Sequence, residues 1–365
     1  MKKIVMVDAA GQGGRCGEER PGHGEDVYIG VDIARSKWVF NVRWGGQERR
    51  KLSTPGQIEH LQSLVREYSN CRVHLVYEAC GFGYEIAWWC QEQEVDVVVI
   101  APSTVEHAPG SRVKTDRLDA GKMARDREQR QLKGVWIPTR TQHEHRQYSR
   151  TYTQAVKDRR RAQARVRSLM QEQGRIGPAP SAGWKAYLRW YEEQELPEAV
   201  AQCGRELLSM REMAAASAKR VQGALLELSR QEPYRPVVEA LQGQGGVGWF
   251  TAIRMVLELG DIRRFRTAGS FPHYMGLTPS EYSTGQYERR GHLIKCGPRF
   301  IRAWLVQCAW ASIRSRRDAG LRAVFERLAP KIGKKRAIVA VARRLALRVR
   351  ARWLEVLDAQ VITAA

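Results

Sequence analysis

"VYIGVDIARSKWVFNV", residues 27–42, is the stretch on which the fold depends. Apolar and polar residues alternate along it and β-branched residues are frequent, a pattern typical of β-strands. The pattern breaks at "WGGQ", residues 44–47, and resumes at "ERRKLST", residues 48–54, so we expect strands joined by a hairpin. Asp32 lies inside this strand pattern, where a carboxylate is costly unless it is paired or binds a metal.

The segments that follow complete a mixed sheet. "STPGQIEHLQSLVREY", residues 53–68, has a Ser/Thr cap, a proline in the first turn and apolar residues at helical spacing. Two short apolar runs, residues 71–81 and 95–103, indicate buried strands, and residues 83–93 between them indicate a helix. Glu78 stands at the end of the first run. The order is three strands, then helix, strand, helix and strand, which predicts an α/β domain.

The net charge of the chain indicates what kind of partner it binds. The chain has 365 residues and a net charge of +22, so its positive charges repel one another, and a polyanionic partner is the best reason for such an excess. Nucleic acid is the first candidate and an anionic membrane the second. No apolar run reaches the roughly 18 to 20 residues that span a bilayer, and the first ten residues make too short an apolar stretch for a signal peptide, so we expect a cytosolic protein. Seven scattered cysteines without a CxxC pair indicate neither a disulfide framework nor a zinc site.

The second half of the chain predicts helices. Residues 149–174 and 206–232 are long helical patterns, and the breaker-rich link at residues 174–184 predicts an antiparallel or coiled-coil pair. The first of these helices carries Arg159, Arg160 and Arg161. Few acidic residues accompany them, which favours phosphate contact over the alternative of a merely solvated face.

From about residue 236 the chain is again predicted to be helical, with glycine-rich joints. "GQGGVG", residues 243–248, opens a helix and resembles the turn of helix-hairpin-helix modules. Residues 331–357 form a basic helix that starts with Lys334, Lys335 and Arg336. We therefore expect a flexible tail at 1–25, an α/β domain at 26–140, a helical coiled-coil domain at 141–235 and a helical domain at 236–365.

Two further carboxylates stand in "KTDRLDA", residues 114–120. Asp116 and Asp119 fall at the start of a predicted helix, and their i,i+3 spacing places them on one helical face. Taken alone, they fit a helix start capped by Thr115, since early aspartates suit the helix dipole. Together with Asp32 and Glu78 at matching strand positions, they favour a site for two Mg²⁺ ions roughly 4 Å apart that would act on a phosphodiester.

These stretches also carry a family resemblance. "IGVDIARSKWVFNV", "YEACGFGY" and "VKTDRLDAGKMA" resemble the RNase H-like (RuvC-like) domain of the bridge-RNA-guided insertion-sequence transposases, the IS-one-ten family and in particular its IS-eleven-eleven subgroup. The likeness covers roughly residues 27–350. It implies a DEDD tetrad of Asp32, Glu78, Asp116 and Asp119, similar to that of Holliday-junction resolvases.

A second motif, "GLTPSEYSTGQYERRGHLIKCGPRFIR" at residues 276–302, resembles the serine region of the same family. The resemblance implies a nucleophilic hydroxyl that holds the DNA end as a phosphoserine. Counting from the two ends of the motif gives Thr284 or Ser283, and we favour Ser283 because a primary hydroxyl is less hindered. Without the resemblance, the loop fits a polar turn. Positive charge near the phosphate would come from Arg289, Arg290, Lys295, Arg299 and Arg302.

The resemblance implies an RNA-guided DNA transposase or recombinase with Mg²⁺ as cofactor. The α/β domain and the serine domain, from one protomer or from two, would build one composite site. The expected partners are donor and target DNA, a structured guide (bridge) RNA and further copies of the chain in a dimer or tetramer, in the bacterial cytoplasm and at the nucleoid when bound to DNA; no membrane partner is expected. Two alternatives stay open: a two-metal nuclease or junction resolvase that uses water, and a non-catalytic nucleic-acid-binding protein.

Overall fold

The structure is a computed structural model that describes residues 20–102, 116–130, 132–281, 287, 290–294, 296–315 and 318–364; for residues 116–119, 290 and 361–364 it describes the backbone alone. The chain forms two compact units, residues 1–140 and 141–365. Most of the predicted tail lies outside the described residues. Its last part is bonded to the sheet unit, because the Gly24 N–H donates to the carbonyl of Asn70 over 2.8 Å.

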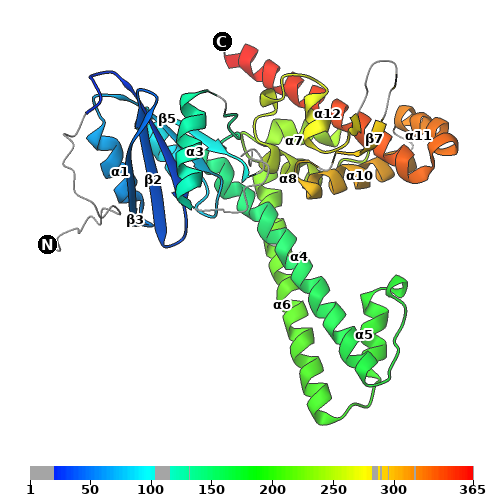
Figure 1. The fold of residues 1–365 in the computed structure, drawn as a ribbon. Helices are drawn as coiled ribbons and strands as arrows, with labels where there is room; N and C mark the ends of the chain where they lie inside the picture. Colours follow the sequence, from blue (N-terminus) through cyan, green and yellow to red (C-terminus); the bar gives the residue numbers. More distant parts are fainter. Residues whose placement is uncertain are drawn as a thin grey trace. The chain divides into compact units, whose positions relative to one another are not determined.

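The first unit is built on a five-stranded mixed sheet (Figure 1). The strands are β1 (Asp26–Ile33), β2 (Lys37–Trp44), β3 (Gln47–Pro55), β4 (Arg72–Glu78) and β5 (Asp96–Ile100). Their spatial order is β3-β2-β1-β4-β5, with β1 antiparallel to β2 and parallel to β4. The predicted α/β domain and its order of strands and helices are therefore confirmed.

Helices cover both faces of this sheet. They are α1 (Ile58–Glu67), α2 (Glu85–Glu92) and α3 (Asp116–Glu128). Side chains alternate between the faces of a strand, so Ile29 and Val31 of β1 join the core that contains Leu61 of α1, whereas Val76 of β4 packs with Met123 of α3 on the other face. The sheet is buried on both sides, which explains the continuous apolar runs of β4 and β5.

The predicted start of α1 is wrong. Residues 53–55, taken as a Ser/Thr cap with a proline in the first helical turn, are instead the last residues of β3. Gln57 is the N-cap residue of α1, and its side chain makes no capping hydrogen bond. The pairing of Ser53 with Val39 and of Thr54 with Trp38 extends the strand over the capping signal.

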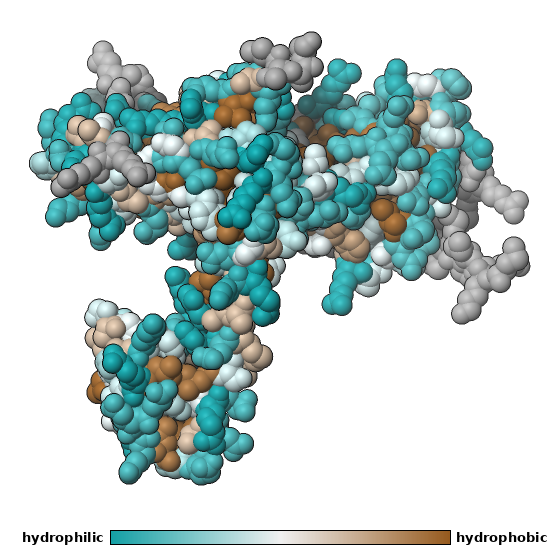
Figure 2. Space-filling view, turned by 180° about the vertical axis from the view of Figure 1, so that it is seen from behind, coloured by the Kyte–Doolittle hydropathy of each residue, from teal (hydrophilic) through white to brown (hydrophobic). Residues whose placement is uncertain are grey.

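The second unit begins with a helical hairpin. It consists of α4 (Arg140–Glu172), a 3-10 turn (Pro180–Ala182), α5 (Trp184–Glu192) and α6 (Glu198–Ser229). The two long helices agree with the prediction, whereas α5, which follows the breaker-rich link, was not predicted. Figure 1 shows α5 beside the far end of the pair, and Figure 2 shows apolar side chains gathered there. Val166, Met170, Tyr187 and Tyr191 form the small core of this tip.

The rest of the second unit is a helical body around one core. Its elements are α7 (Arg235–Gln242), α8 (Trp249–Leu259), a 3-10 turn (Ile262–Arg264), α9 (Ser270–Tyr274), β6 (Pro279–Glu281), β7 (Arg290–Leu293), α10 (Arg299–Arg314), α11 (Ala319–Ile332) and α12 (Lys334–Ala364). The predicted glycine turn separates α7 from α8. At Gly246, whose φ is +80°, a Cβ would lie 2.2 Å from the carbonyl oxygen of Cys308, so only glycine fits there.

A buried arginine joins the root of the hairpin to this body. The Arg254 guanidinium of α8 lies 4.0 Å from the ring centroid of Trp304 and 5.1 Å from that of Tyr152. It also donates to the Thr153 hydroxyl over 2.6 Å. Burial lowers its pKa to about 10, so Arg254 remains a cation at neutral pH. Helices α4, α8 and α10 are thus tied together by one side chain.

Candidate active site

Asp32 and Glu78 stand next to each other on neighbouring strands. In the parallel pairing of β1 with β4, Gly30 lies opposite Val76 and Val31 opposite Tyr77, so the next step of the register sets Asp32 beside Glu78. Neighbouring strands are about 4.8 Å apart. Because alternate residues share a face, Asp32 and Glu78 lie on the face that Gly30 and Val76 present to α3. Two acidic residues therefore share one face at the carboxyl ends of parallel strands.

Helix α3 touches this face with its backbone. A Cβ on Gly30 would lie 2.1 Å from the Ala120 carbonyl oxygen and 2.8 Å from the Ala124 nitrogen, so the helix can approach β1 only because residue 30 is glycine. Sequence reasoning passed over Gly30, although a glycine inside a strand pattern is a known sign of close backbone approach.

The direction of α3 brings its first turn to the same end of the sheet. Glu128, its last residue, accepts a 2.9 Å hydrogen bond from Arg43, the β2 partner of Tyr28 at the start of β1. The middle of α3 lies at Gly30, as described above. The helix thus runs antiparallel to β1, and its first turn, which contains Asp116 and Asp119, lies at the end of β1 that carries Asp32. The side chains of these two aspartates lie outside the described residues.

The pKa of the Cys80 thiol depends on the negative charge at this end of the sheet. It is half-buried two residues beyond Glu78, and burial is the main reason that the pKa of its thiol is raised. The negative charges of Glu78 and Asp32 raise the pKa of Cys80 further, which places both carboxylates within electrostatic reach of one thiol. Cys80 is consequently a neutral thiol at pH 7 and a poor nucleophile.

The oxygen donors fit a hard cation. Among the side chains that the structure describes, no three acidic, histidine or cysteine groups gather as a metal site. Asp32 and Glu78 are two carboxylates side by side, and any third or fourth ligand from α3 belongs to the undescribed side chains. Carboxylate oxygens without nitrogen or sulfur donors are what Mg²⁺ prefers.

The hydroxyl pair Ser283 and Thr284 lies outside the described residues. The chain on either side is described: β6 and β7 are antiparallel, and Glu281 pairs with Arg290. This strand pair corrects the expectation of helices joined by glycine-rich segments in this region. Its strands are only 3 and 4 residues long, too short for an alternating pattern to stand out in the sequence.

The predicted phosphate-binding residues around the hydroxyl pair fall into different classes. Arg289 and Lys295 lie outside the described residues, and of Arg290 only the backbone in β7 is described. Arg299 is exposed in the first turn of α10. Arg302, one turn later, donates to the carbonyls of Met275 and Cys296 over 3.3 and 3.4 Å. Arg302 therefore holds the segment that follows the hydroxyl pair.

The other predicted cations lie on the long helices. On α4, Arg160 and Arg161 are exposed, Arg161 is 3.2 Å from Asp158, and Arg159 is half-buried. Lys334, Lys335 and Arg336 are all exposed in the first turn of α12. No described helix is both long enough and apolar enough to cross a bilayer.

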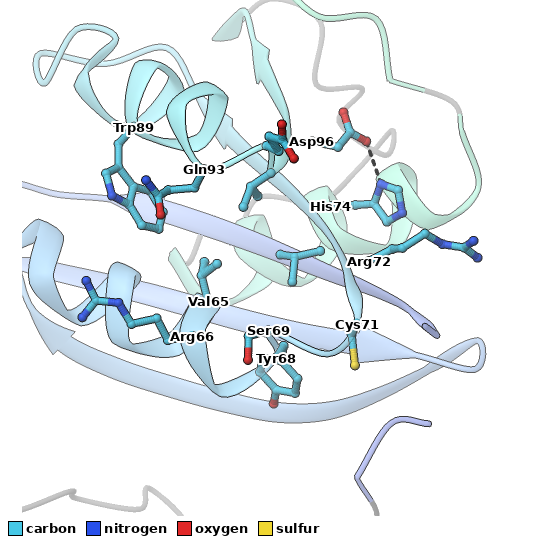
Figure 3. Close-up of a pocket in the computed structure, with 13 residues that line it drawn as sticks. Val65, Arg66, Tyr68, Ser69, Cys71, Arg72, His74, Trp89, Gln93 and Asp96 are labelled. Atoms are coloured by element: carbon cyan, nitrogen blue, oxygen red, sulfur yellow. Dashed lines mark hydrogen bonds and ion pairs between the residues drawn. The ribbon is translucent and has the colours of Figure 1, made fainter. Parts of the chain in front are cut away.

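A pocket of about 440 Å³ lies at the opposite end of β4 from Glu78. Figure 3 shows Trp89 and Gln93 on one side of it and Val65, Arg66 and Tyr68 on another. Because Arg72 and His74, which also line it, are at the start of β4, this pocket is separate from the carboxylates at the strand's end.

Comparisons with known proteins agree with this arrangement. A family described as "Transposase IS116/IS110/IS902 family" matches residues 238–325, and a transposase family of DEDD type from IS110 elements matches residues 29–174. The second match contains all four carboxylates, and the first contains the Ser283 and Thr284 region.

Individual transposases are similar over most of the chain. Transposase y4qE of Sinorhizobium fredii is 29% identical over 78% of this chain and 71% of its own length. The transposase of insertion sequence element IS1111A from Coxiella burnetii is 28% identical over 87% of both chains. The transposase of element IS1328 from Yersinia enterocolitica is 25% identical over 78% of this chain and 83% of its own.

The order of the two family matches along the chain is also the order of the two structural units. Most of the mixed sheet, with Asp32 and Glu78, lies in the DEDD match at residues 29–174, and helices α8 to α10 lie in the match at residues 238–325. The chain is therefore a DNA transposase of the IS110 family, with a DEDD domain followed by a helical transposase domain.

Proposed function

We propose that this transposase cuts and rejoins DNA strands through a covalent phosphoserine, with Asp32, Glu78, Asp116 and Asp119 as a Mg²⁺-binding DEDD site. The observation that carries the proposal is the register of β1 and β4, which sets Asp32 beside Glu78 on the face covered by α3. The close contact of α3 at Gly30 supports it, since the first turn of the helix then starts at the same end of the sheet.

The proposed tetrad would hold Mg²⁺, which when bound supplies positive charge at the scissile phosphate. Ser283, our preferred nucleophile over Thr284, attacks phosphorus with its Oγ. The serine–phosphorus ester forms as one phosphorus–oxygen bond of the DNA breaks, and the departing strand leaves as an alcohol that gains a proton. Attack by another strand's hydroxyl reverses this step, so the bond energy is conserved for rejoining.

Cations of the chain would position the nucleic acids. Arg289, Arg290, Lys295 and Arg299 follow the hydroxyl pair in the sequence, while Arg302 donates to the carbonyls of Met275 and Cys296, which precede and follow that pair. Half-buried Arg159 and exposed Arg160 and Arg161 of α4, together with exposed Lys334, Lys335 and Arg336 of α12, would hold DNA and a structured guide (bridge) RNA by phosphate contacts.

We propose further that the chain belongs to the IS-eleven-eleven (IS1111) subgroup, which the likeness to the IS1111A transposase over 87% of both chains supports. It would act in the bacterial cytoplasm on the nucleoid, as a dimer or tetramer. We retain a division into a tail at 1–25, a DEDD domain at 26–140, a coiled-coil domain at 141–235 and a serine domain at 236–365.

The test is a cleavage assay on DNA that carries the ends of the insertion element, with protein purified together with its RNA. Denaturing gels then detect protein–DNA adducts. We expect Ser283→Ala to lose the adduct while DNA binding stays, and Thr284→Ala to have a milder effect. If only Thr284→Ala loses the adduct, the nucleophile is Thr284.

Two results would favour the alternatives. Cleavage that persists without an adduct in the variant lacking both hydroxyls would indicate a two-metal nuclease or junction resolvase that uses water. If Asp32→Asn changes neither cleavage nor adduct, the carboxylates are not catalytic. If the wild type with its RNA neither cuts the DNA nor forms an adduct, the chain binds nucleic acid without acting on it. Sequencing of the RNA that copurifies tests the guide: an RNA with no match to donor or target DNA would contradict RNA guidance.

A further inference from the structure

A pocket of about 370 Å³ lies between the last two helices, α11 and α12. Its apolar lining comes from Val324 and Leu328 of α11 and Leu347 of α12, and three arginines stand around it: Arg327, Arg343 and Arg344. This volume is at the lower end of the range of ligand pockets. The second half of α11 and all of α12 lie outside both family matches.

Helical spacing makes this pocket part of a longer stripe. On α11, residues 324, 327, 328 and 331 recur at i, i+3, i+4 and i+7, and on α12 residues 336, 340, 343, 344 and 347 follow the same rule. The two helices are joined by Gly333 alone. Lys331 and Arg336 therefore continue the basic rim from the pocket towards the turn between the helices.

The rim arginines are not used by the fold. Arg327, Arg343 and Arg344 are exposed, and in the part of the chain that the structure describes none of them has an ion pair or hydrogen bond. Other arginines of α12 have clear structural contacts. Arg348 binds Asp318 at the start of α11 through two contacts of 3.0 and 2.8 Å, and Arg350 donates to the carbonyl of Phe265.

An apolar pocket bordered by guanidinium groups fits a ligand in which a flat apolar group is covalently joined to anionic groups. A nucleotide has this chemistry, since the base can lie on aliphatic or guanidinium surfaces while the neighbouring phosphates accept from arginine. In a duplex both faces of a base are covered by stacking, so only an unpaired base can enter. A transposase that cuts and rejoins DNA opens strands in which such bases occur.

We propose that the α11–α12 pocket binds an unpaired DNA base, with its flanking phosphates on Arg327, Arg343 and Arg344. This inference rests on the function proposed above only in that the reaction supplies an opened DNA strand. The site is distinct from the carboxylates and the hydroxyl pair, and its role is to hold a strand during exchange.

The experiment measures binding of a fluorescein-labelled dT12 strand to the full-length protein by anisotropy. Arg343→Gln/Arg344→Gln should weaken binding roughly tenfold and reduce the log–log salt slope by about 1.4, as expected for two lost contacts to a single strand. The matched control is Arg352→Gln, an exposed arginine of α12 that pairs with Glu355, which should change affinity less than about twofold.

A second comparison tests the base itself. A 12-residue strand with abasic sites should bind the wild type roughly tenfold more weakly than dT12, and Leu347→Ala should remove most of this difference. Equal binding of the abasic strand to wild type would overturn the base pocket. If Arg343→Gln/Arg344→Gln weakens dT12 binding no more than Arg352→Gln does, the proposal that the rim arginines bind the flanking phosphates is overturned.

Two competitors test the nature of the ligand. Polyglutamate that displaces dT12 at equal charge concentration would show a site for acidic protein, and rU12 that binds more tightly than dT12 would show a site for RNA; either result overturns the DNA assignment. All measurements are repeated in Asp32→Asn protein. Binding there should be unchanged, so failure of the proposed chemistry is distinguished from failure of this site.

Discussion

The two ends of strands β1 and β4 both carry carboxylates, but the surroundings of these carboxylates differ. At the start of the strands, Asp26 is 2.8 Å from Arg72 and 2.9 Å from His74, and the other nitrogen of His74 is 2.6 Å from Asp96. Arg127 of α3 also binds Asp96. Figure 3 shows His74 pointing to Asp96 beside the pocket. These carboxylates are neutralised by the chain itself.

At the other end, Asp32 and Glu78 are adjacent, and no ion pair of Glu78 with a described residue is found. The difference teaches that the carboxylates at the start of the strands serve the fold through ion pairs, whereas those at the carboxyl ends are the ones that the proposed Mg²⁺ site would use. Four predictions test this contrast.

The largest effect should come from the carboxyl ends. Asp32→Asn and Glu78→Gln should each lower strand cleavage by roughly 10² to 10⁴-fold, because a metal site stabilises several kcal/mol of transition-state charge. For Glu78→Gln, thermal stability should not fall, since removing one of two adjacent like charges relieves repulsion. Gel-based cleavage rates and melting curves measure both. A large loss of stability with retained activity would contradict the contrast between the two ends.

A smaller effect is expected from the contact that seats α3. Gly30→Ala would push a methyl group against the Ala120 carbonyl, and overpacking of this kind costs about 1 to 3 kcal/mol. The melting temperature should fall, and so should cleavage, because the first turn of α3 shifts. Gly81→Ala is the control in the same unit, since a Cβ there meets nothing within 4 Å. Equal melting temperatures for the two variants would exclude a tight backbone contact.

The start of the strands should show the reverse behaviour. Asp26→Asn removes the partner of Arg72 and His74 and should lower the free energy of unfolding by up to about 1 kcal/mol, a small value because the side chain is 37% exposed. Cleavage should stay at the wild-type rate. Urea denaturation gives the stability, and Glu59→Gln, at an exposed position on α1, is the control. If Asp26→Asn lost cleavage without losing stability, the start of the strands and not only their carboxyl ends would take part in the reaction.

The smallest effect is a dependence on pH. Hydrogen bonds from Arg72 and His74 lower the pKa of Asp26 to about 2, below the ordinary value of 3.8. Because the folded pKa is the lower one, the contribution of Asp26 to stability is complete above about pH 4 and is lost as the pH falls towards 2. Unfolding curves of wild type and Asp26→Asn should therefore converge in this window. Curves that stay parallel would show that Asp26 titrates normally.

The sequence predicted the sheet better than the parts around the hydroxyl pair. The order of strands and helices up to β5 followed from runs of apolar residues, because local patterns decide these elements. The adjacency of Asp32 and Glu78 depends on a parallel register between distant strands, which no local pattern contains.

Other misses have equally physical causes. The predicted helix cap at Ser53 and Thr54 did not form, because these residues pair with β2, and this tertiary contact outweighs the local signal. Helix α5 was hidden by the glycines and prolines before it, and its aromatic residues Trp184, Tyr187 and Tyr191 are tip core rather than loop. The bonds from Arg302 to the carbonyls of Met275 and Cys296 were also not predictable, because a sequence does not show which backbone acceptors a fold brings to a side chain.

The contact of α3 with Gly30 has a consequence for how the protein tolerates change. Where side chains separate a helix from a sheet, every substitution between them alters the spacing. Here main chain meets main chain, so the height of the helix above β1 is set by atoms that all residues share. The apolar core with α1 and α2 lies on the opposite face of the sheet. Mutations that repack that core therefore leave unchanged the distance between β1 and α3 on the face that carries Asp32 and Glu78.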